Sequence, residues 1–181
     1  LIEIQGVKVF NKRTGSNFAR GVIAAILADI DYSGRLDADI AVLELDEAHA
    51  VKFVDVVQPR YRLLLNVMRD QLDRFGEIDA TAQMLAHIAQ ATTRSVVLNR
   101  EDPRVAPIAE TLPSSTKIDF FGLDTSLRSR FPSDDDLHGA VKEIEARDAD
   151  VILKSFDGNT AVFRFDNSEI AVPLKLRGIY N

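Results

Sequence analysis

The sequence predicts an α/β protein with a mainly parallel sheet flanked by helices and a small antiparallel β-meander at its C-terminal end. Short apolar runs alternate with helix-like segments as far as about residue 124, and this alternation is typical of parallel strands joined by crossover helices. The runs are continuously apolar and bounded by turn residues, which indicates strands buried in a parallel sheet. Beyond residue 150, three runs separated by turns of Asp, Gly, Asn and Ser predict hairpins.

The first predicted elements are a strand at Val7–Phe10, a polar turn at 11–17 and a helix from Phe18 to Ile30. The helix is predicted because apolar residues recur at steps of three and four, and Asn17 can cap its first turn. A helix that begins after a strand and a Gly-containing loop can bind an anion at its N-terminus. A capped connecting helix explains the same pattern.

Two further strands are predicted at Ile40–Leu45 and Tyr61–Leu65, with a helix between them from Glu47 to Val57 that Pro59 terminates. The remaining predicted elements are, in chain order, a helix at 81–91, a strand at 95–98, a short helix ending near residue 110, a strand at 117–121, and meander strands at 151–156, 160–165 and 169–174. We therefore expect a parallel α/β core over residues 1–124, a polar linker at 125–140 and a small antiparallel β subdomain at 141–181.

The composition narrows the class of protein. A length of 181 residues suits one domain, and a net charge of −6 disfavours nucleic acid as a partner, because nonspecific binding needs clustered Lys and Arg. The chain has no Cys, which excludes disulfides, thiolate catalysis and a Cys-based zinc site and fits a cytoplasmic protein. No apolar run approaches the ~20 residues of a transmembrane segment. Because the chain begins at Leu1 without Met, we expect it to be part of a longer protein.

Polar residues at the ends of the predicted strands form the candidate site. Ligands of open α/β sheets bind beyond the carboxyl ends of the strands. The stretch Asp39–Asp79 is therefore expected to place several carboxylates, the amide of Asn66 and two guanidinium groups on one rim. Glu44 interrupts an apolar run, and a carboxylate in a buried strand is costly unless it is paired or binds a metal. Glu44 is therefore either a Mg²⁺ ligand, because this ion prefers oxygen donors, or the partner of a nearby arginine.

Other polar groups of this region have ordinary structural explanations as well. Asp46 and Glu47 can start the following helix, where acids interact favourably with the helix dipole. Asp73 and Arg74 can belong to a surface ion-pair cluster. The segment Asn99–Pro103 offers an amide and a carboxylate to a ligand, and it is also a good turn with a helix-starting proline.

A set of short motifs occurs in the order found in one protein family. The motifs are Thr14–Gly21 (TGSNFARG), Ala41–Glu47 (AVLELDE), Leu65–Glu77 (LNVMRDQLDRFGE), Leu98–Pro103 (LNREDP), Phe121–Gly122 and Gly178–Asn181 (GIYN). Together they resemble the central domain of Mur ligases, in particular of the MurT type, the ligase-like subunit of lipid II isoglutaminyl synthase, in its actinobacterial form. The resemblance covers nearly the whole chain and implies that residues 1–124 form a nucleotide-binding core of the phosphate-loop class.

The resemblance implies a function in peptidoglycan biosynthesis. An enzyme of this type would use ATP and Mg²⁺ to activate the α-carboxylate of D-glutamate in the lipid II stem peptide, and ammonia would then give D-isoglutamine. A GatD-type glutaminase subunit would supply the ammonia. The residues that the resemblance assigns to ligands are Glu44 for Mg²⁺, Asn99 and Asp102 near the adenosine, Asn66 and Asp73 on the phosphate side, and Asn17 and Asn181 at the nucleotide or substrate rim.

The sequence also departs from the family pattern. The phosphate loop of the family would precede Val7 and is not in this sequence, which removes the backbone cradle and the Lys that bind phosphates. Gln71 stands where other Mur ligases carry His, which puts a second metal site in doubt. No zinc is expected, because the four-Cys ribbon of many MurT relatives has no counterpart in a chain without Cys. The C-terminal domain expected to contact the glutaminase is also outside the sequence, so we expect the 181-residue chain alone to lack ATPase and amidation activity.

Other functions remain open on the sequence alone. The chain can belong to an amino-acid-adding Mur ligase or a folylpolyglutamate synthase-like enzyme, although the pattern at 70–74 favours the MurT type. It can also be a nucleotide-binding scaffold without catalysis. A receiver-like signalling domain is disfavoured, because such a domain needs a Lys at the end of its last strand and residues 121–124 offer none.

Overall fold

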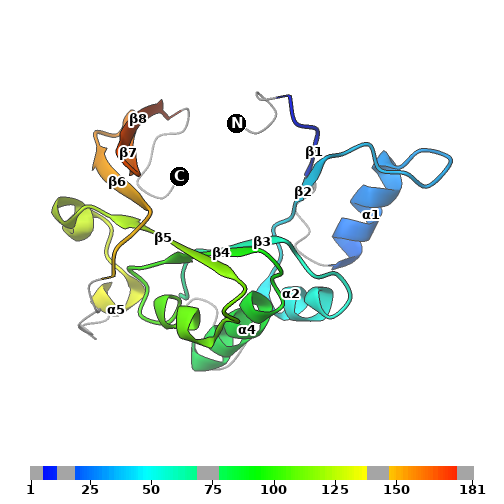
Figure 1. The fold of residues 1–181 in the computed structure, drawn as a ribbon, viewed down its shortest axis with the longest axis horizontal. Coiled ribbons are helices and arrows are strands. Elements are labelled where there is room, and N and C mark those ends of the chain that lie inside the picture. The colour runs from blue at the N-terminus through cyan, green and yellow to red at the C-terminus, as the bar shows by residue number, and fades with distance from the viewer. Residues whose placement is uncertain (1–5, 12–18, 69–77, 138–146, 175–181) are drawn as a thin grey trace. The chain divides into compact units, whose positions relative to one another are not determined.

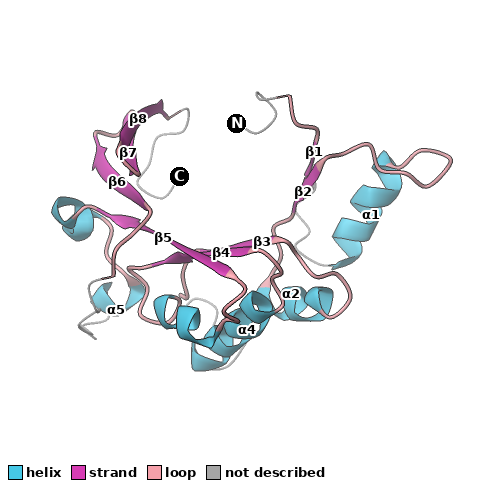
Figure 2. Ribbon diagram, viewed as in Figure 1, coloured by secondary structure: helices cyan, strands magenta, loops and turns pink. Residues whose placement is uncertain are grey.

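The fold was examined in a computed structural model that describes residues 6–11, 19–68, 78–137 and 147–174. The chain divides into two compact units, Leu1–Val57 and Gln58–Asn181. Figure 1 traces the chain in sequence order, and Figure 2 shows its helices and strands.

The N-terminal unit contains two parallel strands and two helices. Its elements are β1 (Val9–Asn11), α1 (Ala19–Asp29), β2 (Ile40–Val42) and α2 (Glu47–Val54). β1 and β2 pair from Val9↔Ile40 to Asn11↔Val42. The unit has a small core, because its buried apolar side chains in the described residues are Phe10, Val22, Ala50 and Val54.

The C-terminal unit is built on a six-stranded sheet with the order β3-β4-β5-β6-β7-β8. The strands are β3 (Tyr61–Leu64), β4 (Ser95–Asn99), β5 (Lys117–Leu123), β6 (Val151–Phe156), β7 (Thr160–Phe165) and β8 (Ser168–Pro173). β3 to β6 run parallel, and β6 to β8 are antiparallel neighbours. Because β6 pairs with β5, the C-terminal meander continues the parallel sheet.

The two faces of the parallel strands differ in exposure. Leu64 and Leu98 lie opposite each other in the register and are buried together with Val96, on the face that belongs to the core of this unit. The helix α4 (Ile78–Gln90) and the short 3-10 helix η3 (Ala106–Thr111) pack against each other, and Figure 1 shows α4 on one side of β3–β5. Strand residues alternate between faces, and Leu63 on the opposite face is 57% exposed.

A bulge separates the two halves of β6. The register of β6 with β7 shifts between Leu153 and Ser155, immediately after Leu123↔Leu153, the last pair of β6 with β5. A bulge bends its strand and increases the twist, so the meander is directed away from the parallel strands. The outermost strand, β8, has an exposed Ile170, and its Glu169 forms an ion pair with Lys154 of β6.

The structure confirms the predicted fold class, a mainly parallel sheet flanked by helices with an antiparallel C-terminal end, and it corrects several element boundaries. β2 ends at Val42 and not at Leu45, because its only ladder in the described residues, with β1, stops there. α2 ends at Val54, before the predicted Val57, and α4 begins at Ile78, ahead of its predicted start.

The predicted linker at 125–140 contains regular structure in its described part. The 3-10 helix η4 (Thr125–Arg130) places Leu127 in the core, and the short helix α5 (Asp134–Leu137) follows. The proposed division of the chain at residues 124 and 140 stays a prediction. Among the described residues, no helix is long and apolar enough to cross a membrane.

Two guanidinium nitrogens of one half-buried arginine in the sheet lack a hydrogen bond within the described residues. Nε and Nη2 of Arg62, in β3, are buried and form no hydrogen bond within the described part of the chain, and burial lowers the pKa of the Arg62 guanidinium. Replacing an uncompensated buried charge by an apolar side chain of similar length removes its desolvation cost. We expect Arg62→Met to raise the free energy of unfolding by about 1 kcal/mol, measured by chemical denaturation.

Arg60, which is exposed and lies beside Tyr61, provides the control for this prediction. Arg60→Met should change the free energy of unfolding by less than about 0.5 kcal/mol. If Arg62→Met proves less stable than Arg60→Met, the guanidinium of Arg62 stabilises the fold and the prediction is wrong.

The β6–β7 turn depends on an ionised carboxylate. Oδ1 of Asp157 accepts hydrogen bonds from the backbone N–H groups of Asn159 at 2.8 Å and Thr160 at 2.7 Å, and these bonds lower the pKa of Asp157. A carboxyl whose pKa is lower in the folded chain contributes stability above its unfolded pKa of about 3.9, and this contribution is lost as the pH falls through the folded pKa. We expect the Tm of the wild type to fall more steeply below about pH 4 than the Tm of Asp157→Asn, which keeps an oxygen acceptor but does not titrate. Parallel Tm curves for the two proteins would contradict this prediction.

Candidate functional site

The carboxyl ends of β3, β4 and β5 bring together the candidate residues of the C-terminal unit. β3 is followed by Asn66, which is exposed, and β4 ends at Asn99, which is half-buried. The loop after β4 leads to Asp102 and then to η3. These three residues follow neighbouring parallel strands. Glu44 and Asn66, which the sequence predicts on one rim, follow strands of different sheets, because β2 pairs with β1 and β3 belongs to the six-stranded sheet.

Asp102 joins two loops through its carboxylate. Its side chain is buried, with 6% of the residue exposed. Oδ2 accepts a hydrogen bond from the backbone N–H of Val67 at 2.8 Å, and Oδ1 accepts from the N–H groups of Arg104 at 2.8 Å and Val105 at 2.9 Å. The loop after β3 is therefore held against the loop after β4, and both carboxylate oxygens of Asp102 have backbone partners.

The side-chain amide of Asn99 has a defined orientation. Its Oδ1 accepts a hydrogen bond from the backbone N–H of Glu101 at 2.9 Å. A backbone N–H can only donate, so the amide oxygen must face it and the amide nitrogen must face away. Within the described part of the chain, Nδ2 of Asn99 makes no hydrogen bond.

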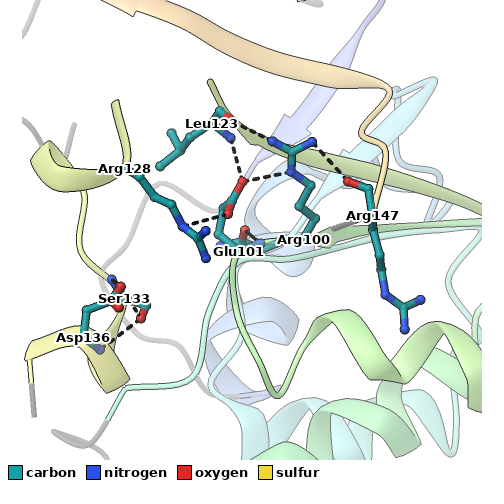
Figure 3. A network of polar contacts seen from close by, with 8 residues as sticks. Arg100, Glu101, Leu123, Arg128, Ser133, Asp136 and Arg147 are labelled. Carbon is teal, nitrogen blue, oxygen red and sulfur yellow. Dashed lines mark hydrogen bonds and ion pairs between the residues drawn. The ribbon is translucent and has the colours of Figure 1, made fainter. Parts of the chain in front are cut away.

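Arg100 and Glu101 connect the ends of three strands (Figure 3). Nε of Arg100 donates to Oε1 of Glu101 at 2.9 Å, and Nη2 donates to the carbonyl of Leu123 at 2.6 Å. Nη1 donates to the carbonyl of Arg147, ahead of β6, at 3.1 Å. Oε1 of Glu101 also accepts from the N–H of Leu123 at 3.1 Å, and Oε2 lies 3.7 Å from Nε of Arg128. We call this arrangement of Arg100 and Glu101 the clamp.

Two further acids near this edge accept hydrogen bonds from residues in their own turns. Oδ1 of Asp124 accepts hydrogen bonds from the hydroxyl of Ser126 at 2.7 Å and its N–H at 3.0 Å, which start η4 and lower the pKa of Asp124. Asp136 accepts from the hydroxyl of Ser133 at 2.7 Å and from its N–H, and these bonds lower its pKa. Both carboxylates are explained by local turns.

Glu44, the predicted Mg²⁺ ligand, lies in the N-terminal unit. The expectation that it lies inside a buried strand is wrong, because β2 ends at Val42 and Glu44 is exposed. Its role as a ligand stays a prediction. Within the described residues there is no group of three or more His, Cys, Asp or Glu able to hold a metal ion, so any metal at Glu44 would need donors from elsewhere.

Asp46 illustrates the alternative explanation for acids after a strand. It is buried and caps α2, with Oδ1 accepting from the N–H of Ala48 at 3.2 Å and lying 3.4 Å from Nδ1 of His49. Its structural role is therefore the start of a helix. Three other predicted ligand-binding residues, Asn17, Asp73 and Asn181, lie outside the described residues, as does Gln71.

The sequence reasoning did not find the clamp. It treated residues 99–103 as a turn, and a neighbouring Arg and Glu in a turn are usually solvated. Two signals were present: opposite charges directly after a buried strand, and a glycine, Gly122, directly after the next predicted parallel strand. Chemically, this edge offers an amide donor at Asn99, an exposed amide at Asn66 and backbone that is fixed by buried carboxylates.

Comparison with curated proteins finds two types of Mur enzyme. The chain is 35% identical over 125 residues to the MurT subunit of lipid II isoglutaminyl synthase from Streptococcus pneumoniae, a match that covers 68% of this chain and 26% of that protein. It is 29% identical over 105 residues to MurT of Staphylococcus aureus. It is 30% identical over 185 residues to the UDP-N-acetylmuramoylalanine–D-glutamate ligase of a Polaromonas species, covering 94% of this chain and 30% of the ligase. The chain thus spans less than a third of the curated relatives it matches.

Solved structures of Mur ligases share the fold. MurF from Acinetobacter baumannii superposes with a TM-score of 0.69 at 20% identity, over 98% of this chain and 34% of that one. MurF from Thermotoga maritima in complex with ADP gives a TM-score of 0.66 at 20% identity, over 96% and 35% of the two chains.

The family model covers almost all of the sequence. The Mur ligase middle domain matches residues 22–181. This range includes Asn66, Asn99 and Asp102 at the carboxyl edge described above. The match spans most of the chain, and the fold of solved Mur ligases agrees with it. The chain belongs to the Mur ligase family, as its middle domain.

Proposed function

We propose that this chain is the ATP-binding middle domain of a MurT-like subunit that amidates D-glutamate in the stem peptide of lipid II. Members of the Mur ligase family are ATP-dependent amide-bond ligases. The observation that carries the proposal is the carboxyl edge, where Asn99 presents an oriented amide beside two loops fixed by Asp102. The similarity to two MurT subunits supports the choice of substrate.

In the proposed reaction the α-carboxylate of the D-glutamate residue becomes an acyl phosphate, with ADP as the other product. Ammonia then attacks the acyl carbon, phosphate leaves, and the amide of D-isoglutamine results. Charge neutralisation around the phosphates and positioning of the reacting groups provide most of the rate in such phosphoryl transfers. A GatD-type glutaminase subunit is the proposed source of ammonia, and the reaction is proposed to occur in the cytoplasm.

The residues at the carboxyl edge suit the binding of a nucleotide. The N–H donors of Asn99 match the acceptor atoms of a nucleoside, and the exposed amide of Asn66 can contact phosphate oxygens. In the N-terminal unit, Glu44 is proposed to supply the hard oxygen donor that Mg²⁺ prefers. Asn17, Asp73 and Asn181 are proposed to complete the nucleotide site.

Asp102 is proposed to act through the backbone. Because both of its oxygens accept hydrogen bonds from N–H groups, its contribution to an adenosine site is to place the neighbouring loops. This refines the expectation that Asp102 itself lies against the adenosine.

A second candidate function is the addition of D-glutamate to a UDP-linked muramoyl-alanine. The observation in its favour is the match to the D-glutamate ligase of Polaromonas, which covers 94% of this chain. Both reactions proceed through an activated carboxylate, so they differ in the acceptor and in the nucleophile, which is ammonia in one case and an amino acid in the other.

The two functions are separated by supplying each nucleophile to the whole protein that contains this domain. With ATP, Mg²⁺ and lipid II, we expect glutamine together with a copurified glutaminase, or free ammonium, to give a product lighter than lipid II by about one mass unit, because amidation replaces OH by NH₂. D-Glutamate with UDP-N-acetylmuramoyl-alanine should give no product. Formation of the D-glutamate adduct and no amide would show that the second function is correct.

The Mg²⁺ role of Glu44 predicts a specific kinetic defect. Glu44→Gln removes the negative charge but keeps the size of an exposed side chain, so the fold should be unchanged. We expect the rate of amidation in the whole protein to fall at least about 100-fold, with an unchanged circular dichroism spectrum and Tm.

Glu47→Gln is the matched control for Glu44→Gln, because Glu47 is a nearby acid of the same type, in the first turn of α2. It should retain nearly full activity. Equal rates for Glu44→Gln and the wild type at low Mg²⁺ would exclude the proposed role of Glu44.

The joining of two loops by Asp102 predicts a large loss of stability. Asp102→Ala leaves the N–H groups of Val67, Arg104 and Val105 without their acceptor, and unsatisfied buried donors are costly. We expect the free energy of unfolding to fall by about 3 kcal/mol, measured by chemical denaturation. Asp46→Ala, which removes a buried helix cap, should cost about 1 kcal/mol. A loss for Asp102→Ala no larger than for Asp46→Ala would show that the three hydrogen bonds contribute little.

A further inference from the structure

The two side chains of the clamp make polar contacts with each other and with the backbone of Leu123 and Arg147. All three guanidinium nitrogens of Arg100 have partners, namely Oε1 of Glu101 and the carbonyl groups of Leu123 and Arg147. The backbone N–H of Arg100 also donates to the carbonyl of Phe121 at 3.0 Å. The side chains of Arg100 and Glu101 are only 17% and 18% exposed, so solvent screens these contacts less than it would on the surface.

Gly122 gives the clamp the room that it needs. A Cβ atom at position 122 would lie 2.6 Å from Nε of Arg100 and 2.9 Å from Oε1 of Glu101, which is closer than nonbonded atoms approach. Gly122 lies in β5 and pairs with Ile152 of β6. Because Gly122 has no side chain, the ion pair of Arg100 and Glu101 can occupy the space beside this position of β5.

The clamp acts on Asn99 through the backbone of Glu101. The side chain of Glu101 is held by Arg100 and by the N–H of Leu123, so the peptide N–H of Glu101 has a fixed position. That N–H is the donor to Oδ1 of Asn99. With its oxygen facing this N–H, the Asn99 amide directs Nδ2 away from it, and Nδ2 offers a ligand two N–H donors.

We infer that Arg100 and Glu101 are positioning residues for nucleotide binding, which orient the Asn99 amide so that Nδ2 donates to an acceptor atom of the nucleoside. This inference rests on the proposed function for the ligand, while the coupling between the clamp and Asn99 is a property of the folded chain alone. The inferred role of Arg100 and Glu101 is exerted through Asn99, because each guanidinium nitrogen of Arg100 and Oε1 of Glu101 already has a partner within the protein. Substitutions in the clamp therefore change the orientation of Asn99 before they change any ligand contact.

The coupling is tested first without a ligand, by NMR of the ¹⁵N-labelled 181-residue chain. The side-chain amide signals and order parameter of Asn99, assigned with the Asn99→Asp variant, report on its orientation. We expect Glu101→Ala to give a mobile Asn99 amide with shifted signals, and Gly122→Ala to have a similar effect because its Cβ displaces both clamp side chains. Glu101→Gln retains an oxygen for the N–H of Leu123 and should restore most of the order.

Glu110→Ala is the control, because it breaks another Arg–Glu ion pair, between Arg147 and an exposed Glu110. It should leave the Asn99 signals unchanged. If Glu101→Ala does not fold, the comparison of Gly122→Ala with Glu101→Gln decides. Unchanged Asn99 signals in every folded clamp variant would overturn the inference, as would equal changes in Glu110→Ala.

The second arm measures the affinity of the whole protein for MgADP by calorimetry. We expect the Kd to rise about tenfold for Glu101→Ala, which corresponds to the loss of one well-placed hydrogen bond, and to return towards the wild-type value in Glu101→Gln. A mobile Asn99 with an unchanged Kd would overturn the positioning role in nucleotide binding. If the wild type does not bind MgADP, the proposed function fails, and the first arm still decides whether the clamp orients Asn99.

Discussion

The carboxylate of Asp102 holds the loops at the functional edge of the larger unit. It is an anion that is almost fully buried, and its partners are three backbone N–H groups from two loops. Backbone donors have directions fixed by the chain, so they orient the carboxylate and the carboxylate orients them. The loop after β3 and the turn that starts η3 therefore form as one structure. The amide of Asn99 and the clamp depend on this turn being in place.

Four acids of the chain show how context decides the role of one functional group. Asp46, Asp102 and Glu101 lie after strands, as Glu44 does, and yet each of the first three accepts hydrogen bonds from within the protein. Glu44 differs in being exposed beyond the end of β2. An exposed carboxylate loses less hydration when it binds a metal ion than a buried carboxylate that is engaged by the backbone.

The sequence was sufficient to predict the fold class, the strands β3 to β5 of the parallel sheet and the polar residues that follow β3 and β4. These follow from local patterns: apolar runs of strand length, turn residues and the position of polar residues after them. The sequence could not predict the end of β2, because strand length depends on the partner strand. It could not predict the role of Asp102 in bridging two loops, since Val67 is 35 residues away. The clamp was missed for the same reason, because its contacts are made with Gly122 and Leu123, which lie in another strand.

The meander ends in β8, one of the two edge strands of the six-stranded sheet. Within the described residues β8 pairs only with β7, so its outer edge offers unpaired backbone groups to any extended peptide, and Ile170 adds apolar surface there. Such edges promote strand addition between molecules, and natural sheets limit it with charged side chains and proline. Glu169, anchored by Lys154, and Pro173 at the end of the strand provide both devices. The outer strand therefore carries its own protection against aggregation.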